Sequence, residues 1–396
     1  MSNYVMMPLA DNVEEMFIGP FGSSLKNDCF VDKDNGFCMV YEQKHAIQKT
    51  MNVKTRYVDK KKYNELKRFN IRGGDIIVSC RGTIGETFIV PDNAPLGIMH
   101  PSIMKIRIKE EVYDKFYFNL LLRERLKKHE AEANGSGIKM AISARELGAE
   151  FFPVPPMNEQ RRISSLVLEV TKVIEVLQQQ FKKLDELVKA RFVEMFGNPA
   201  TNPKGWTTKP LLDMGYCKNG MNFHTGDSGM EMHCLGVGDF KDMSVIDGTE
   251  HLPVISLNEA PPEESMLRDG DIVFVRSNGN KALVGRCLVV YPHNTPTTYS
   301  GFCIRYRLTS NEVVVDYLLR VLKADSMRKK MAGRGVNIQN LNQQILASLY
   351  IPLPPIKLQE QFAAFVEQVN KSKAAVQKAL DEAQLLLDSL MQQYFL

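Results

Sequence analysis

Two long stretches of the chain, residues 156–197 and residues 355–396, carry apolar side chains at steps that alternate between four and three positions. These steps place the apolar side chains in a narrow seam along one side of a helix. Such a seam is typical of a coiled coil, whereas a helix that lies on a globule needs a wider stripe. The seam positions are Ile163, Val167, Val170, Ile174, Leu177, Phe181, Leu184 and Val188 in the first stretch and Phe362, Val366, Val369, Val376, Leu380, Ala383, Leu387, Leu390 and Tyr394 in the second, with Lys373 at one further position.

Each predicted helix follows a Pro-Pro pair, which favours an end to extended structure and a fresh helix start. At ~1.5 Å per residue, the seam from Ile163 to Met195 is about 50 Å long. Two matching seams in one chain most simply pair with each other. The alternatives are that each helix packs on its own globule, or that the chain dimerises through its helices.

The rest of the chain divides into two units that share landmarks in the same order. Arg72 opens RGGDIIVSCRGTIGETFIVP, and Arg268 opens RDGDIVFVRSNGNKALVGRCLVVYP. Further on, GSGIKMAISARELGAEFFPVPPMNEQ at Gly135 matches GRGVNIQNLNQQILASLYIPLPPIKLQEQ at Gly333. We therefore expect four segments: a globular unit over 1–155, a helix over 156–197, a second unit over 198–354 and a second helix over 355–396.

Both globular units are predicted to be α+β. Short β-rich runs are bounded by turn residues, and helical stretches lie between them and the long helices. The alternating rhythm of a doubly wound parallel sheet is absent. The expected strands include Asp75–Ser79, Thr87–Val90, Asp271–Val275 and Cys287–Tyr291, and the expected helices are roughly Val112–Glu132 and Val314–Met331.

Composition narrows the class of protein only a little. The 396 residues carry a net charge of +4, with 44% apolar and 24% charged residues, as in ordinary soluble proteins. No apolar stretch reaches membrane-spanning length and the N-terminus lacks a signal-peptide pattern, so we expect a cytoplasmic protein. The seven cysteines form no CxxC pair, which argues against structural zinc and a disulfide framework.

The motifs of common catalytic sites are missing. The sequence has no [DN]-P-P-[YFW] motif of adenine methyltransferases, no P-loop, no HExxH and no GxSxG. Asp75 and Asp271 recur beside glycine in both units, and we interpret them as turn residues before a strand rather than as a nuclease pair. We therefore predict no catalytic, cofactor or metal site in this chain.

Polar and basic loops are the remaining candidates for function. Arginine can read guanine, asparagine and glutamine can read adenine, and lysine contacts phosphate. At aligned positions the loops of the two units differ, which suits two different DNA targets. For any single residue, the alternative is a solvated loop that makes no contact with DNA. The candidates are Lys26, Arg81, Lys139 and Arg145 in the first unit and Arg276, Asn278, Asn280, Lys281, Arg334, Asn337, Gln339 and Asn340 in the second.

The order of these features resembles the specificity subunit of type I restriction–modification systems over essentially the whole chain. The segments that carry the resemblance are GPFGSSLK at Gly19, VSCRGTIG at Val78, FPVPPMNEQRRI at Phe152, FGNPATNPKGW at Phe196 and IPLPPIKLQEQFAAFV at Ile351.

The resemblance implies that each globular unit is a target recognition domain for one half of a split sequence in double-stranded DNA. It implies that the helices form an antiparallel coiled coil, which sets the gap and docks two methyltransferase subunits. Those partners would carry S-adenosylmethionine and methylate adenine by base flipping. Restriction subunits, with ATP and magnesium, would complete the assembly. This chain would supply recognition alone.

Two other functions remain open at the level of sequence. A coiled-coil scaffold whose globular ends bind proteins would show no sequence-specific retention of DNA and little dependence on salt. A self-sufficient enzyme would transfer methyl groups as the purified chain, although it lacks the expected motifs.

Overall fold

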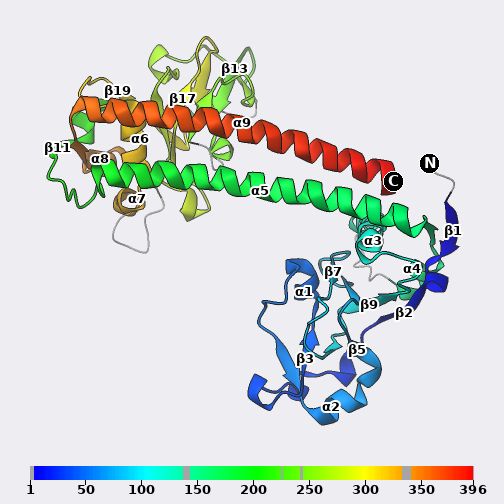
Figure 1. The fold of residues 1–396 in the computed structure, drawn as a ribbon. Helices are drawn as coiled ribbons and strands as arrows, with labels where there is room; N and C mark the ends of the chain where they lie inside the picture. Colours follow the sequence, from blue (N-terminus) through cyan, green and yellow to red (C-terminus); the bar gives the residue numbers. More distant parts are fainter. Residues whose placement is uncertain (1–3, 137–142, 224–225, 241–243, 332–339, 396) are drawn as a thin grey trace. The chain divides into compact units, whose positions relative to one another are not determined.

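The computed structural model describes residues 4–136, 143–223, 226–240, 244–331 and 340–395, shown in Figure 1. The chain forms two compact units. Unit 1 consists of Met1–Leu177 with Ala379–Leu396, and unit 2 consists of Gln178–Lys378. Each unit contains one globular part together with portions of both long helices.

Unit 1 is built on two four-stranded sheets. The first is antiparallel, in the order β2-β9-β6-β7, and the second, β4-β3-β8-β5, contains the parallel pair β3 and β8. A separate two-stranded sheet pairs β1 with β10. The strands are β1 (Val5–Pro8), β2 (Val13–Ile18), β3 (Cys38–Tyr41), β4 (Arg56–Val58), β5 (Asn70–Ile71), β6 (Ile76–Ser79), β7 (Thr87–Ile89), β8 (Gly97–Met99), β9 (Ile103–Ile108) and β10 (Phe151–Val154); the helices of the globular part are α1 (Gln43–Gln48), α2 (Lys60–Glu65), α3 (Lys115–Ser136) and α4 (Ala144–Ala149).

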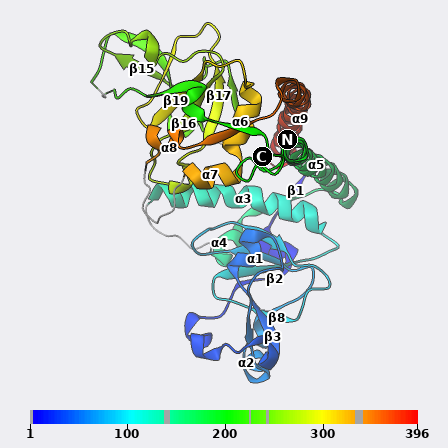
Figure 2. The ribbon, with the colours of Figure 1, turned by 90° about the vertical axis from the view of Figure 1, so that its left-hand side faces the viewer.

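Unit 2 repeats this plan. Its largest sheet, β12-β19-β16-β17-β14, contains an antiparallel core that matches the first sheet of unit 1, and β13 runs parallel to β18 as β3 does to β8. Helix α6 packs on β17 (Figure 2). The strands are β11 (Thr207–Pro210), β12 (Gly215–Asn219), β13 (Met230–Leu235), β14 (Val245–Asp247), β15 (Val254–Leu257), β16 (Asp271–Val275), β17 (Cys287–Tyr291), β18 (Thr297–Tyr299), β19 (Cys303–Leu308) and β20 (Tyr350–Leu353); the short helices are α6 (Val315–Lys323), α7 (Asp325–Met331) and α8 (Gln343–Ala347).

The predicted α+β class and the four predicted strands are confirmed to within one residue at their ends. The stretch Val314–Met331 is not one helix but two, because the chain turns to an extended conformation at Ala324. In the part of the chain that the structure describes, no helix is both long and apolar enough to cross a membrane.

The two long helices, α5 (Met157–Phe196) and α9 (Ile356–Phe395), run antiparallel to each other. In unit 1 the start of α5 meets the end of α9, where the Arg162 guanidinium lies 5.6 Å from the centroid of the Tyr394 ring. In unit 2 the end of α5 meets the start of α9, where the rings of Phe192 and Phe362 lie 5.5 Å apart. The predicted pairing of the seams is therefore confirmed.

The helices also pack on the globular parts, so the alternative of packing on a globule is partly right. In unit 1, Ile163 and Val167 join the core formed by the first sheet and α3. In unit 2, Phe192 and Phe196 join the core formed by β16, β17 and α6. Each end of α5 thus shares its apolar side chains between the partner helix and a globular core.

A buried glutamine anchors the first turn of each long helix. In unit 1 the Gln160 side chain is fully buried and donates to the carbonyls of Val112 and Pro155, both at 2.8 Å, while its Oε1 accepts from the Asp114 N–H at 2.9 Å. Gln359 makes the corresponding bonds in unit 2, to Glu312, Pro354 and Val314. In both units the anchoring glutamine stands four residues after the second proline of the Pro-Pro pair, at Gln160 and Gln359.

A buried carboxylate organises the start of β6 and of β16. Asp271 is 1% exposed, accepts from the Arg268 N–H at 2.7 Å and forms two hydrogen bonds, at 2.8 and 2.7 Å, with the Arg307 guanidinium of β19. Asp75 pairs with Arg107 of β9 in the same way in unit 1. The interpretation of both aspartates as turn residues is confirmed, and each also ties its turn to a neighbouring strand.

We expect Gln359→Leu to lower the free energy of unfolding of unit 2 by about 3 kcal/mol, because it leaves buried backbone groups without hydrogen bonds. Urea denaturation compares this variant with Gln368→Leu, which changes an exposed residue of the same helix. Equal denaturation midpoints for the two variants would contradict the anchoring role.

We expect Asp271→Ala to destabilise unit 2 by about 3–5 kcal/mol, because it leaves a buried guanidinium without its counter-charge. Glu259→Ala removes the same charge from an exposed loop of unit 2 and should change stability by less than about 0.5 kcal/mol. Thermal unfolding followed by circular dichroism measures both. A melting temperature for Asp271→Ala that matches the control would refute the assignment.

Candidate nucleic-acid interface

The loop that follows β16, residues 276–285, is shaped by short polar side chains. Asn278 Oδ1 accepts from the Asn280 N–H at 2.8 Å, and Asn280 Oδ1 accepts from the Ala282 N–H at 3.0 Å. The loop closes where the Gly285 N–H donates to the Val275 carbonyl at 2.9 Å. Because the side-chain oxygens of Asn278 and Asn280 already accept hydrogen bonds from the backbone, their amide nitrogens are the groups best placed to bind a ligand.

This loop forms one side of an open groove of about 550 Å³ in unit 2. Ser277 and Asn340 form an isolated antiparallel bridge, and the Leu341 N–H donates to the Arg276 carbonyl at 2.8 Å. Asn340 is thereby brought to the loop despite its distance along the chain. The groove is lined by Val237, Ser277, Asn278, Gly279, Lys281, Phe302 and Asn340.

Phe302 is an exposed aromatic side chain on the wall of this groove. It is 60% exposed, in the turn between β18 and β19. Its carbonyl accepts from the Arg276 N–H at 2.8 Å, while the guanidinium of Arg276 donates to the Gly301 carbonyl at 3.3 Å. The Arg276 side chain is half-buried. It therefore holds the turn that presents Phe302.

The corresponding loop of unit 1, residues 80–85, is shorter. The Cys80 N–H donates to the Ser102 carbonyl at 2.9 Å, and Arg81 beside it is exposed. A Cβ added at Gly82, which has a φ of 74°, would lie 4.0 Å from Gln43 Nε2. The loop and the first turn of α1 are therefore neighbours, and Arg81 and Gln43 lie in the same part of unit 1.

Charge around the loop of unit 1 is mainly positive. Burial lowers the pKa of His100; Glu42 opposes this effect, and the nearby cations Arg56 and Arg81 add to it. His100 is consequently neutral at pH 7, and its Nδ1 lies 2.8 Å from Ser102 Oγ. The polar side chains around this loop are therefore cations and amides rather than an imidazolium.

The other predicted residues are distributed more widely. Lys26 is exposed just before a short 3₁₀ turn, and Arg145 is exposed in the first turn of α4. In the described part of unit 1, no hydrogen bond or ion pair joins either residue to Arg81. Lys139, Arg334, Asn337 and Gln339 lie outside the described residues.

Sequence reasoning missed Gln43, Val237 and Phe302. All three follow from one topological fact: β3 is parallel to β8, and β13 is parallel to β18. The segment after the first strand of each pair and the turn after the second lie beside the loop after β6 or β16. The pairing of two strands so distant in sequence gives no local signal.

The described residues offer little for catalysis. They contain no cluster of three or more histidine, cysteine or acidic side chains that could hold a metal ion. Burial raises the pKa of Cys80 and of Cys303 to about 12, so both thiols are protonated and poorly nucleophilic at neutral pH.

Comparison with known proteins identifies the family of this chain. The family described as the type I restriction modification DNA specificity domain matches residues 12–186 and 265–384. The chain is 28% identical to the type I restriction enzyme StySPI specificity subunit of Salmonella potsdam over 259 residues, which are 61% of this chain and 55% of that subunit. It is 20% identical to the MjaVIII specificity subunit of Methanocaldococcus jannaschii over 352 residues, which are 81% of this chain and 80% of that subunit.

Solved structures share the fold. The S subunit of a type I restriction–modification system from M. genitalium aligns with a TM-score of 0.58 and 15% identity over 100% of this chain and 97% of that one. A chain from a study of complex assembly and conformational transition in the type I R-M system aligns with a TM-score of 0.61 and 17% identity, covering 100% and 98% of the two chains. On the strength of the family match, which covers most of its length, this chain belongs to the family of type I restriction–modification DNA specificity subunits.

Proposed function

We propose that this chain recognises a bipartite sequence in double-stranded DNA for a type I restriction–modification complex and performs no chemistry itself. Residues 1–155 and 198–354 are its two target recognition domains, and residues 156–197 and 355–396 are the spacer helices. The observation that carries the proposal is the repeated scaffold, with equivalent sheets and equivalent Asp–Arg and glutamine anchors, that presents different loops at the same position in each unit.

In unit 2 the groove beside β16 has the chemistry of a base reader. Asn278 and Asn340 offer amides, Lys281 offers a cation for phosphate, and Phe302 offers a flat apolar surface. Asn280 lies at the exposed tip of the same loop, while Arg276 acts mainly by holding the turn around Phe302. The groove therefore combines groups for base contact with one for backbone contact.

In unit 1 the corresponding readers are Arg81 and, beside it, Gln43. An arginine that donates two hydrogen bonds to guanine is the commonest specific contact in the major groove. Lys26, Lys139 and Arg145 would add contacts to phosphate or bases, as Arg334, Asn337 and Gln339 would in unit 2. The two units would then read different half-sites.

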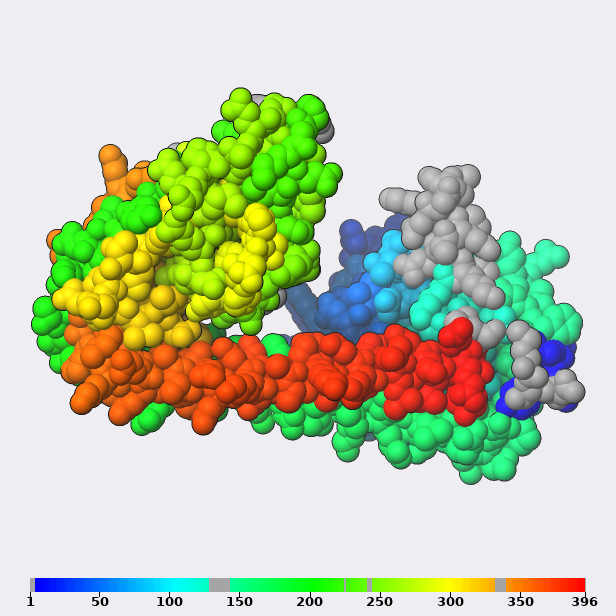
Figure 3. Space-filling model, turned by 90° about the horizontal axis from the view of Figure 1, so that it is seen from above, coloured from blue at the N-terminus to red at the C-terminus, as the bar shows by residue number. Residues whose placement is uncertain are grey.

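The antiparallel helices would set the distance between the half-sites. Several apolar side chains remain exposed outside the seam, which is unusual for a surface that faces only water and suits a protein partner. These residues are Leu168, Val173, Val176, Leu187, Val193, Leu385 and Leu386, and Figure 3 shows α9 as an exposed ridge. We propose that two methyltransferase subunits dock along the helices. They would bring S-adenosylmethionine, and restriction subunits would add ATP and magnesium.

We expect Arg81→Ala to weaken recognition of one half-site by about 1–3 kcal/mol, and Asn340→Ala to do the same to the other half-site only. Competition binding with the assembled methyltransferase, together with mapping of methylated adenines, measures both effects. The matched controls are Lys33→Ala in unit 1 and Asn311→Ala in unit 2, both exposed. If a variant binds as its control does, the substituted residue is solvated and makes no contact with DNA. If both half-sites are affected, the two units do not read DNA independently.

We expect one heptad inserted after Leu177, matched by one after Lys378, to widen the recognised gap by about three base pairs. Seven helical residues add about 10.5 Å, and base pairs are spaced about 3.4 Å apart. Insertion in only one helix should abolish recognition, because the two helices would then differ in length between the same two globular parts. If the doubly extended chain still methylates sites with the original gap, the helices do not measure the DNA.

A further inference from the structure

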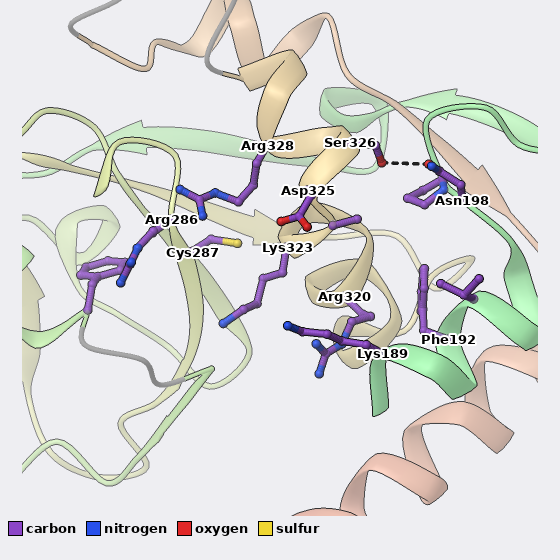
Figure 4. A pocket seen from close by; sticks show the side chains of 14 residues that line it. Lys189, Phe192, Asn198, Arg286, Cys287, Arg320, Lys323, Asp325, Ser326 and Arg328 are labelled. Atoms are coloured by element: carbon purple, nitrogen blue, oxygen red, sulfur yellow. Dashed lines mark hydrogen bonds between the residues drawn. The ribbon is translucent and has the colours of Figure 1, made fainter. Parts of the chain in front are cut away.

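A second cavity in unit 2 lies beside the loop at residues 276–285, since Arg286, the residue after this loop, lines it. It has a volume of about 540 Å³ and is lined by residues from the end of α5, from β17 and from α6 and α7. The Arg328 Nη2 donates to the carbonyl of Ala282, at 2.9 Å, so the wall of the cavity is tied to the loop at residues 276–285. Figure 4 shows the side chains that line it.

The charged side chains that line the cavity are mainly basic. Among the described residues that line it, five carry basic side chains and one, Asp325, carries an acidic side chain. Lys189, Arg320 and Lys323 are directed toward the same space in Figure 4. The five cations are Lys189, Arg286, Arg320, Lys323 and Arg328.

Burial makes this concentration of charge costly. Burial lowers the pKa of Arg320 and of Lys323, and the neighbouring Arg320 lowers that of Lys323 further. Asp185 opposes the lowering of both pKa values, and Asp316 opposes that of Arg320. Lys323 Nζ bonds to Ser244 Oγ at 2.7 Å. Arg328 Nε is buried and has no hydrogen-bond partner among the described residues. An anion in the cavity would offset both the repulsion and the unsatisfied donor.

The size of the cavity and the side chains that line it indicate which kind of anion it would bind. Guanidinium groups donate paired hydrogen bonds that match phosphate oxygens, and several cations together favour a group that carries more than one charge. The cavity is larger than a single carboxylate requires, and Phe192 and Phe240 give it an apolar side. We propose that this cavity is a phosphate-binding site, whose phosphate comes from a free phosphorylated small molecule or from the DNA backbone beside the recognition loop.

The test compares Arg320→Gln/Lys323→Gln with Lys329→Gln/Lys357→Gln, a control of equal charge at two exposed positions of unit 2 that do not line the cavity. In the first arm, calorimetry with inorganic pyrophosphate should give saturable binding to the full chain. The double variant should weaken it at least tenfold, and the control should not. This arm does not depend on DNA recognition.

In the second arm, binding to a random 40-base-pair duplex is measured at several salt concentrations. If the phosphate comes from DNA, pyrophosphate binds weakly or not at all, and the slope of log affinity against log salt becomes shallower by about 1–2 in the double variant only. Lys189→Gln, at an exposed lining position, should show a smaller effect of the same kind and serves as the readout if the double variant does not fold.

The proposal is overturned if the cavity variants match the control in both arms. It is also overturned if they lose only binding to the methyltransferase subunits, since that result would assign the cavity to a carboxylate of a protein partner.

Discussion

The junction between each long helix and its globular part is the interaction on which the rest of the structure depends. A glutamine amide is buried there with three hydrogen bonds to backbone groups, in unit 1 at Gln160 and in unit 2 at Gln359. A backbone donor can be satisfied by this amide in one position and orientation only. The first turn of the helix is therefore fixed to the globular part by directional bonds, in addition to apolar packing that would tolerate some sliding.

A rigid scaffold leaves the loops free to differ. The Asp–Arg pairs at the start of β6 and β16 fix the strand that leads into the loop at residues 80–85 or 276–285. These ion pairs lie outside the loops, so the polar residues of the loops can differ between the two units without disturbing them. In unit 2 the side-chain oxygens of Asn278 and Asn280 accept hydrogen bonds that shape the turns of the loop itself. Different loops on equal supports are what a reader of two different half-sites requires.

Much of this architecture could be predicted from sequence, and the misses share a physical cause. The seams, the four strands and the repeat are local or periodic patterns, and the structure confirms them. Arg81 could be named because it lies in the contiguous loop after β6, and Asn278 and Lys281 because they lie in the contiguous loop after β16. Gln43, Val237 and Phe302 could not, because their places beside those two loops depend on parallel strand pairs far apart along the chain. The roles of Asn278 and Arg276 as supports for the backbone are likewise visible only in the hydrogen bonds.

The one charged position in the second seam has a consequence for alignment of the helices. Lys373 Nζ lies 2.9 Å from Asp185 Oδ1 and 4.5 Å from the centroid of the Phe181 ring. Sliding one helix by seven residues would set the ammonium opposite Gln178 or Phe192, neither of which carries a negative charge. Such a slip keeps the apolar seams in contact but separates the ion pair, as single polar positions do in other coiled coils. The helices therefore favour one alignment over its neighbours, and alternative alignments differ from it by whole heptads rather than by small shifts.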